Sequence, residues 1–170
     1  MTPRHVLVPS PIGDLTVVAE DGAITRLHLH AAKHRPSEAD HYGEPGDPTE
    51  EPFASAVRQL GEYFRRERRD FDLPLAPAGD DFAQRVWALL RTIPYGETTT
   101  YGALARSLGD RNLAQAVGHA NGHNPIAIVI PCHRVIGSDG SLVGYAGGLE
   151  RKRFLLALEE PLPDVAGRLF

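Results

Sequence analysis

The chain has 170 residues, of which 42% are hydrophobic and 24% are charged, a composition that can bury one good core or two small ones and that excludes a disordered protein. The formal net charge of −4 by itself argues against a nucleic-acid partner, but residues 1–81 have nine Arg and Lys against fifteen Asp and Glu, whereas residues 82–159 have eight against five. The second half could therefore face a polyanion, although the first half could not.

Residues 5–30 predict an antiparallel meander of three short strands, at 5–8, 15–19 and 24–30. Apolar and polar residues alternate in the third of these segments, and Asp21-Gly22 before it is typical of a tight hairpin turn. This pattern indicates a small sheet with one face available for a helix.

Residues 31–52 contain four prolines and many acidic residues without apolar periodicity, which predicts a long surface loop. A helix is expected at 53–66, because apolar residues recur there at helical spacing after the acidic pair Glu50-Glu51. The apolar positions are Phe53, Val57, Leu60 and Phe64. This helix should cover one face of the sheet.

A Pro- and Gly-rich stretch at 74–79 predicts a linker, and we place a domain boundary there. The expected fold is α+β. A small N-terminal support domain with an antiparallel sheet and a helix, residues 1–78, precedes a mostly helical, winged-helix-like domain, residues 79–170.

The second domain is expected to begin with a helix at 82–90, capped by Asp80 or Asp81. Two short helices follow at about 100–107 and 112–120, joined by a turn that contains glycine, which is the helix-turn-helix pattern. The small residues of the second helix would let its backbone approach a ligand closely. An ordinary helical hairpin packed on itself explains the same spacing equally well.

The apolar run 126–130 is expected to be buried, in an extended conformation that Pro131 stops. Residues 150–159 predict a last helix with Phe154, Leu155 and Leu158 facing inward.

Cys132 is the only cysteine, so neither an internal disulfide nor a zinc site built on cysteine pairs can form. A thiol with a pKa near ~8.5 is mostly protonated at neutral pH and needs a group that takes its proton. His133 is adjacent, but in an extended strand it would point to the opposite face, so contact requires a turn or a bridging water. A carboxylate on the other imidazole nitrogen would orient it, and Glu159 is the candidate. For an isolated Cys-His pair, a buried thiol beside a surface histidine is the commoner arrangement.

Three motifs favour a catalytic Cys-His pair over a merely buried thiol: Asn124-Pro125, Pro131-Cys132-His133-Arg134-Val135 and Gly144-Tyr145-Ala146-Gly147-Gly148. Together they closely resemble the active-site region of the O6-alkylguanine-DNA alkyltransferases. The resemblance extends over nearly all of residues 80–160 and is weaker in the first half.

The resemblance implies a suicide DNA repair protein, in which an alkyl group moves from O6 of a damaged guanine to the protein's own Cys132. His133 would take the thiol proton through a water, Glu159 would orient His133, and Asn124 would brace the turn. Tyr101 would donate a proton to the departing guanine. No metal and no cofactor is implied.

The same resemblance implies how the damaged base and the duplex would be bound after base flipping from the minor groove. The amide of Ala146 would hold O6, the carbonyls of Cys132 and Val135 would accept from the exocyclic amine, and Tyr145 would wall a pocket that Gly147 and Gly148 complete. The implied DNA contacts are Thr100, Arg111, Ala114, Gln115, Ala116 and Gly118.

Gln115 departs from the family pattern, which has an arginine there that enters the duplex in place of the flipped nucleotide. Glutamine can donate from its amide but lacks the charge and the planar fork of arginine. We therefore expect weaker duplex binding or slower flipping than in a typical member, with Arg111, one turn earlier, as a partial substitute.

Other charged or metal-ligating side chains are set aside. Solvated strand and loop histidines explain His28, His30, His34 and His41 better than a zinc site does. Arg65, Arg66, Arg68 and Arg69 are expected at a charged helix end. Lys152 lies near the pocket in the family, yet its neighbours also suggest an exposed basic turn. Arg134, whose partner the sequence does not identify, is expected to support the loop.

The leading hypothesis is therefore irreversible alkyl transfer from double-stranded DNA that carries O6-alkylguanine. Two other classes remain: a lesion-binding protein without transfer activity, which the presence of Cys132 disfavours, and a cysteine hydrolase, which would turn over. Because no signal-peptide-like or membrane-spanning run is visible, we expect a cytoplasmic protein without membrane contact, monomeric in solution. Activity on O4-alkylthymine and cooperative assembly on DNA stay open.

Overall fold

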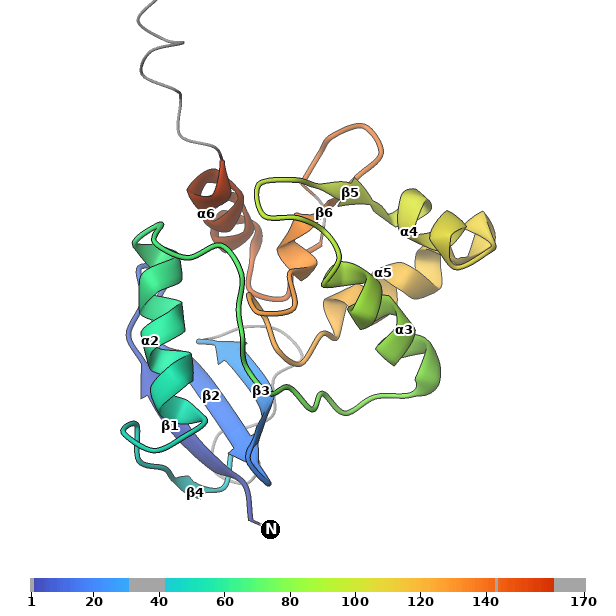
Figure 1. Cartoon of the computed structure of the whole chain (residues 1–170). Helices are drawn as coiled ribbons and strands as arrows, with labels where there is room; N and C mark the ends of the chain where they lie inside the picture. The colour runs from blue at the N-terminus through green and yellow to red at the C-terminus, as the bar shows by residue number, and fades with distance from the viewer. Residues whose placement is uncertain (1, 31–41, 143, 161–170) are drawn as a thin grey trace, which may run out of the picture.

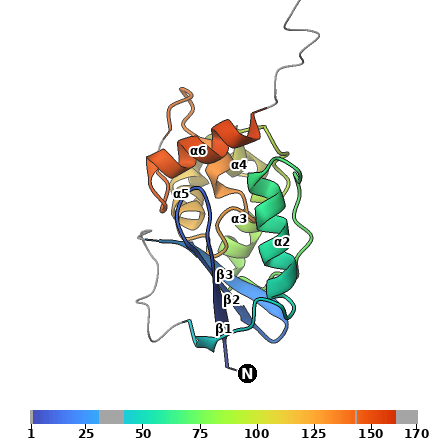
Figure 2. The ribbon, with the colours of Figure 1, turned by 90° about the vertical axis from the view of Figure 1, so that its left-hand side faces the viewer.

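The computed structural model describes residues 2–30, 42–142 and 144–160. An antiparallel sheet with one helix forms the N-terminal part, and a group of helices forms the rest, so the expected α+β class is confirmed. The sheet edge strand β4 (Glu44–Pro45) lies at one end of the molecule and helix α6 (Leu149–Glu159) at the opposite end (Figures 1 and 2).

The predicted meander is confirmed as strands β1 (Arg4–Val8), β2 (Leu15–Glu20) and β3 (Ala23–Leu29), which pair as antiparallel neighbours. Asp21 and Gly22 have φ angles of 54° and 81°, the left-handed conformation that a tight hairpin turn requires at both positions. A two-residue strand, β4 (Glu44–Pro45), pairs parallel with β1. The prediction of an uninterrupted loop over 31–52 is therefore wrong at these two residues, and residues 31–41 of it lie outside the described part.

Helix α2 (Phe53–Phe64) packs against the sheet and ends two residues before the predicted limit. Its buried face carries Phe53, Ala56 and Leu60, but also Gln59 and Tyr63. Gln59 forms two hydrogen bonds with the backbone of Asp72, of 2.9 and 2.8 Å, which satisfy its buried amide.

The predicted linker begins as an extension of the sheet. The amide of Ile24 donates to the carbonyl of Pro74 at 2.8 Å, and the amide of Ala76 donates to the carbonyl of Ile24 at 2.8 Å. The chain is thus tied to β3 before it enters the helical domain.

The helical domain begins with α3 (Asp81–Leu90), whose first turn is capped by the Asp80 carboxylate accepting from the amide of Ala83 at 2.8 Å. The two predicted short helices are present as α4 (Tyr101–Ser107) and α5 (Ala114–Gly122), with a 3₁₀ turn, η1 (Arg111–Leu113), between them. Helix α5 contacts both α3 and α4. The helix-turn-helix arrangement is therefore present, with a longer connection than the sequence suggested.

The apolar run 126–130 is buried as expected, but it forms turns and is not an extended strand. Ile128 has a φ of 72°, and the amide of Ile130 bonds back to the carbonyl of Ile126 at 3.0 Å. Leu27 of β3 holds the start of the run, since its amide donates to the carbonyl of Pro125 at 2.8 Å and its carbonyl accepts from Ala127. The sheet domain thus anchors the segment that leads to Cys132.

After Cys132, a two-stranded parallel pair joins β5 (Thr99–Thr100) to β6 (Val135–Ile136), and α6 (Leu149–Glu159) closes the fold. Leu155 and Leu158 of α6 face inward as predicted, but Phe154 is 38% exposed, so its predicted inward position is wrong. Lys152 and Glu159 lie three before and four after Leu155 and share its buried face, which turns Phe154 toward solvent. Within the described residues, no helix is long and apolar enough to cross a membrane.

Candidate active site

Cys132 lies at the start of a 3₁₀ turn, η2 (Cys132–Arg134), directly after Pro131. Asn124 fixes the preceding bend, because its side-chain amide donates to the carbonyl of Ile130 at 2.7 Å and its side-chain oxygen accepts from the amide of Ile126 at 3.0 Å. The turn replaces the extended geometry in which Cys132 and His133 would have pointed to opposite faces.

His133 is fully buried, and its Nε2 lies 2.7 Å from Oε2 of Glu159 at the end of α6. Its other nitrogen, Nδ1, is buried without a hydrogen-bond partner among the described residues. Burial lowers the pKa of His133, although hydrogen bonding to Glu159 opposes this effect. The ring is therefore neutral at neutral pH, and with Nε2 donating to Glu159 its Nδ1 keeps a free lone pair.

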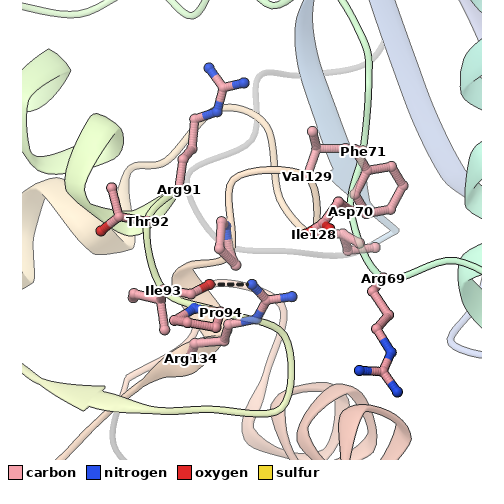
Figure 3. A pocket seen from close by; sticks show the side chains of 11 residues that line it. Arg69, Asp70, Phe71, Arg91, Thr92, Ile93, Pro94, Ile128, Val129 and Arg134 are labelled. Atoms are coloured by element: carbon pink, nitrogen blue, oxygen red, sulfur yellow. Dashed lines mark hydrogen bonds between the residues drawn. The ribbon is translucent and has the colours of Figure 1, made fainter.

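Glu159 is also held by Arg134, whose partner the sequence left unidentified. Nε of Arg134 donates to Oε1 at 2.8 Å and Nη2 donates to Oε2 at 3.0 Å, while Nη1 donates to the carbonyl of Ile93 at 2.6 Å (Figure 3). Burial alone would raise the pKa of Glu159, but the hydrogen bonds from His133 and Arg134 and their charges outweigh it and lower the pKa to about 2. The carboxylate stays ionised and cannot take the proton from His133.

The Cys132 thiol is only 6% exposed, and burial raises its pKa, with a hydrogen bond from Asn124 and the charge of Lys152 acting in the opposite direction. The resting thiol is therefore protonated. A base must remove its proton before the sulfur can act as a nucleophile.

Lys152 is fully buried, so the interpretation of its surroundings as an exposed basic turn is wrong for this residue. Its Nζ donates to the carbonyl of Val135 at 2.6 Å and to the carbonyl of Gly144 at 3.3 Å. Burial lowers its pKa to about 8, although the nearby Cys132 opposes the shift. The signal that could have found it is its position on the same helical face as Leu155 and Glu159.

Tyr101 begins α4 and lies near the thiol. A Cβ built on Gly118 would be 3.7 Å from Cδ1 of Tyr101, and one built on Gly144 would be 3.7 Å from its hydroxyl. Burial raises the pKa of Tyr101, and the nearby Cys132 raises it further, so the hydroxyl remains a proton donor.

Asn121 is a buried pocket residue that the sequence did not single out. It interacts with the hydroxyl of Tyr101, and its Nδ2 donates to the carbonyl of Cys132 at 3.4 Å. The carbonyl of Cys132 therefore has two donors already, Asn121 and the backbone amide of Val135, and the carbonyl of Val135 accepts from Lys152. A carbonyl oxygen has two lone pairs, so a ligand that bonds to the Cys132 carbonyl has to displace or share one of these donors.

Tyr145 is buried, and its hydroxyl has no hydrogen-bond partner among the described residues. Its ring lies against Gly147, where a Cβ would come within 2.7 Å of Cε2, so this position accepts only glycine without a shift of the ring. Ala146 and Gly147 are half-buried and Gly148 is exposed, with a φ of 97° just before α6.

The expected DNA-contacting residues differ in their exposure to solvent. Arg111, Gln115 and Ala116 are exposed on η1 and α5, whereas Ala114 and Gly118 are half-buried. Thr100 serves the fold itself, because its hydroxyl accepts from the amide of Ala103 at 3.1 Å and caps α4.

The buried charges predict a loss of stability in acid. The pKa of Glu159 falls from 4.5 to about 2 on folding, so its stabilisation is present above pH 4.5 and is lost as the pH falls toward 2. His133 adds to this loss from about pH 6.5 downward, because its pKa is lowered in the folded state and the unfolded chain binds the proton first. We expect urea unfolding to show a free energy that declines below pH 6.5, with on the order of 3 kcal/mol lost through Glu159. A free energy of unfolding that stays constant from pH 7 to pH 3 would contradict this assignment.

The fold and the site together define an α+β protein with a helix-turn-helix and a single buried thiol beside an imidazole–carboxylate pair.

Comparison with known proteins gives the family. Residues 81–161 match the DNA binding domain of 6-O-methylguanine DNA methyltransferase, and residues 4–77 match the ribonuclease-like domain of the same protein. The chain belongs to the 6-O-methylguanine DNA methyltransferase family.

Individual relatives support this assignment over most of the chain. A methylated-DNA–protein-cysteine methyltransferase of Mycolicibacterium paratuberculosis is 52% identical over 154 residues, 89% of each chain, and one of Methanosarcina acetivorans is 44% identical over 155 residues, 91% of this chain and 97% of its own. The crystal structure of Mycobacterium tuberculosis OGT in complex with DNA is similar with a TM-score of 0.85 and 49% identity, covering 92% of both chains.

Proposed function

We propose that this protein repairs alkylated DNA by moving the alkyl group from O6 of guanine to Sγ of Cys132. The single observation that carries the proposal is the buried set formed by the only thiol and the neighbouring imidazole, whose Nε2 is held by Glu159 at 2.7 Å. The names of the relatives, methylated-DNA–protein-cysteine methyltransferases, support the same reaction.

In the proposed reaction, Nδ1 of His133 accepts the thiol proton through a water, and Sγ attacks the saturated carbon bound to O6. The S–C bond forms as the C–O6 bond breaks, and its electron pair passes to the guanine ring. Tyr101 donates a proton to the departing guanine, which leaves as a neutral base, and the resulting phenolate regains a proton from the imidazolium of His133 through water after the transfer. The imidazolium is stabilised by Glu159, which remains ionised throughout.

The product is a thioether, which water does not hydrolyse, so each molecule reacts once. The lone cysteine is consistent with this outcome, since a second reactive thiol would compete for the alkyl group.

The damaged base would enter the pocket by flipping out of the duplex, with α5 approaching the minor groove. The carbonyls of Cys132 and Val135 accept from the exocyclic amine, the amide of Ala146 holds O6, and Tyr145 forms the wall. The buried hydroxyl of Tyr145, which has no hydrogen-bond partner among the described residues, suits a site that a polar ligand completes.

Gln115 and Arg111 are exposed where α5 and η1 would meet DNA, which yields a prediction about flipping. Gln115→Arg should accelerate transfer from duplex DNA by roughly 10-fold, because a guanidinium forms charge-assisted bonds worth more than those of an amide. Arg111→Ala should slow it. Single-turnover rates on duplex and on free O6-benzylguanine, which needs no flipping, measure the effect. If neither variant changes the duplex rate, this role of the two residues is wrong.

We further propose that the first domain ends at residue 78 and the second begins at residue 79, just after Ala76, where the linker makes its own last backbone bond to β3. We also propose that the protein acts in the cytoplasm and as a monomer in solution; its relatives' role as DNA repair proteins supports the location.

The function is tested by intact-mass measurement after incubation with excess duplex that contains O6-methylguanine. We expect one methyl group per molecule, located on Cys132 by peptide mapping, and no consumption of DNA beyond one equivalent. Absence of an adduct with retained binding would indicate a lesion-binding protein, and consumption beyond one equivalent would indicate a hydrolase; either result rejects the proposal.

A further inference from the structure

Glu159 accepts another hydrogen bond, and this one comes from the N-terminal domain. The hydroxyl of Tyr63, in the last turn of α2, donates to Oε2 of Glu159 at 2.5 Å, although the two residues are 96 positions apart. The C-terminal end of α2 lies next to the C-terminal end of α6 in both views of the ribbon (Figures 1 and 2). A second bond between these ends, from Arg66 to the carbonyl of Ala157, agrees with this arrangement.

The hydroxyl completes the set of donors around the carboxylate. Oε2 accepts from Tyr63, His133 and Arg134, and Oε1 accepts from Arg134. An ionised carboxylate offers about two lone-pair sites on each oxygen, so the three donors on Oε2 saturate that oxygen, and together with the bond to Oε1 they fix the rotation of the carboxylate. Burial, together with the neighbouring charge of Glu159, raises the pKa of Tyr63 well above its ordinary value. Tyr63 therefore keeps its proton and acts only as a donor.

The direction of the Tyr63 hydroxyl is set by aromatic packing. The ring is fully buried, with centroids at 5.2 Å from Phe64, 5.3 Å from Phe71 and 6.3 Å from Tyr95. The contacts with Phe64 and Tyr95 are edge-to-face, the arrangement that aromatic pairs prefer. Residues of the sheet domain and of the segment after it thus aim one polar atom at the catalytic end of α6.

We propose that Tyr63 is a positioning residue for alkyl transfer, through which the N-terminal domain completes the Cys132–His133–Glu159 relay. Its hydroxyl holds Glu159 against Nε2 of His133, so that the ring presents an unprotonated Nδ1 to the thiol. The proposal rests on the proposed function for its rate effect, but not for its effect on the imidazole.

If the bond between Tyr63 and Glu159 served only to join the two domains, its removal would change stability alone. The free energy of unfolding would fall, and the chemistry of the folded protein would stay unchanged. A positioning bond also alters His133: without the Tyr63 donor, Oε2 carries more charge toward Nε2 and stabilises the imidazolium. The charged and titratable groups around this pair stay the same in the variant. Arg134, Tyr95 and Tyr145 interact with Glu159, Lys152 interacts with His133, and Arg66 and Arg69 interact with Tyr95.

The test uses the full chain with Tyr63→Phe, which removes one oxygen and keeps the ring. Tyr95→Phe is the matched control, since it removes a hydroxyl from the same aromatic cluster. The hydroxyl of Tyr95 donates to the carbonyl of Leu158 at 3.3 Å and not to Glu159. We expect Tyr63→Phe to slow single-turnover methyl transfer by roughly 10-fold to 100-fold, which is the effect of losing a hydrogen bond to a charged group. We also expect the acidic limb of the pH–rate profile to move to higher pH. Tyr95→Phe should keep the rate and the profile of the unmodified protein.

A second measurement does not depend on the reaction. The ¹⁵N shifts of His133, assigned by comparison with His133→Gln, report its tautomer and its titration in the absence of DNA. We expect Tyr63→Phe to raise the pKa of His133, and 3-fluorotyrosine at position 63, a stronger donor of nearly the same shape, to lower it. If the phenylalanine variant does not fold, the fluorinated protein alone decides.

The outcomes separate the two proposals. A folded Tyr63→Phe protein whose rate, pH profile and His133 titration match those of the unmodified chain overturns the positioning role, whatever its stability. If the unmodified protein transfers no methyl group, the proposed function fails, and the His133 titration still decides whether Tyr63 controls the imidazole.

Discussion

Replacement of Cys132 by serine is expected to abolish methyl transfer to the protein. The hydroxyl of serine is far harder to deprotonate than a thiol, and His133 is a neutral base whose pKa burial lowers. Removal of the nucleophile from a comparable relay costs on the order of 10⁶-fold in rate, which would leave no measurable transfer here. The measurement is intact mass after long incubation with methylated duplex.

The serine variant should still fold and bind the damaged duplex. Oγ replaces Sγ in a site that is 6% exposed, and a buried hydroxyl without a full set of partners costs roughly 1–3 kcal/mol. Equal affinity of both proteins for unmethylated duplex, which the cysteine protein does not consume, is the control and is measured by fluorescence anisotropy. If the serine protein accumulates a methyl group at the rate of the cysteine protein, Cys132 is not the acceptor.

The environment of the thiol explains why a relay is needed at all. Burial raises the pKa of Cys132 and lowers that of His133, so both groups are neutral at rest. Charge separation between them is then unfavourable unless something stabilises the imidazolium, and Glu159 is the ionised group in contact with it. In the proposed reaction, the thiol is therefore unreactive at rest and becomes a nucleophile through a proton transfer to His133 that Glu159 stabilises.

Local patterns in the sequence predicted most of the secondary structure. Strand alternation, the Asp21-Gly22 turn and the Asp80 cap depend on neighbours along the chain, and all three are present in the structure. The conformation of the apolar run 126–130 was harder to predict, because the sequence pattern of a short buried segment is the same whether the segment is extended or turned. Its conformation depends on hydrogen bonds to Asn124 and Leu27, which a linear pattern does not reveal.

The residues of the candidate site also divide into those that the sequence could predict and those that it could not. Cys132, His133 and Glu159 carry chemistry in their residue types, so the sequence could propose them together. The residue types of Lys152 and Tyr63 gave no such signal, because a lysine on a helix is usually exposed and a tyrosine is often simply packed. The helical spacing of Lys152 with Leu155 and Glu159 could have indicated its burial, but Phe154 was assigned inward because a lysine is not expected on a buried face.

Replacement of Glu159 by glutamine should affect stability and chemistry together. The amide leaves the buried guanidinium of Arg134 without a counter-charge, and breaking a buried ion pair in this way costs about 3–5 kcal/mol, or a Tm lower by roughly 6–20 °C for a chain of this size. It should also slow methyl transfer on the order of 10³-fold or more, because an amide no longer selects the imidazole tautomer with Nε2 protonated. Thermal unfolding and single-turnover transfer measure the two effects, with exposed Glu160→Gln as the control.

A double variant separates the two effects of Glu159. Adding Arg134→Leu to Glu159→Gln removes the uncompensated charge, and hydrophobic replacement of a buried pair is often neutral, so much of the lost stability should return. Transfer should stay slow, because leucine restores neither the orientation nor the charge next to His133. If the double variant regains the transfer rate along with its stability, then Glu159 acts on the reaction only through the fold, and the relay assigned to it is incorrect.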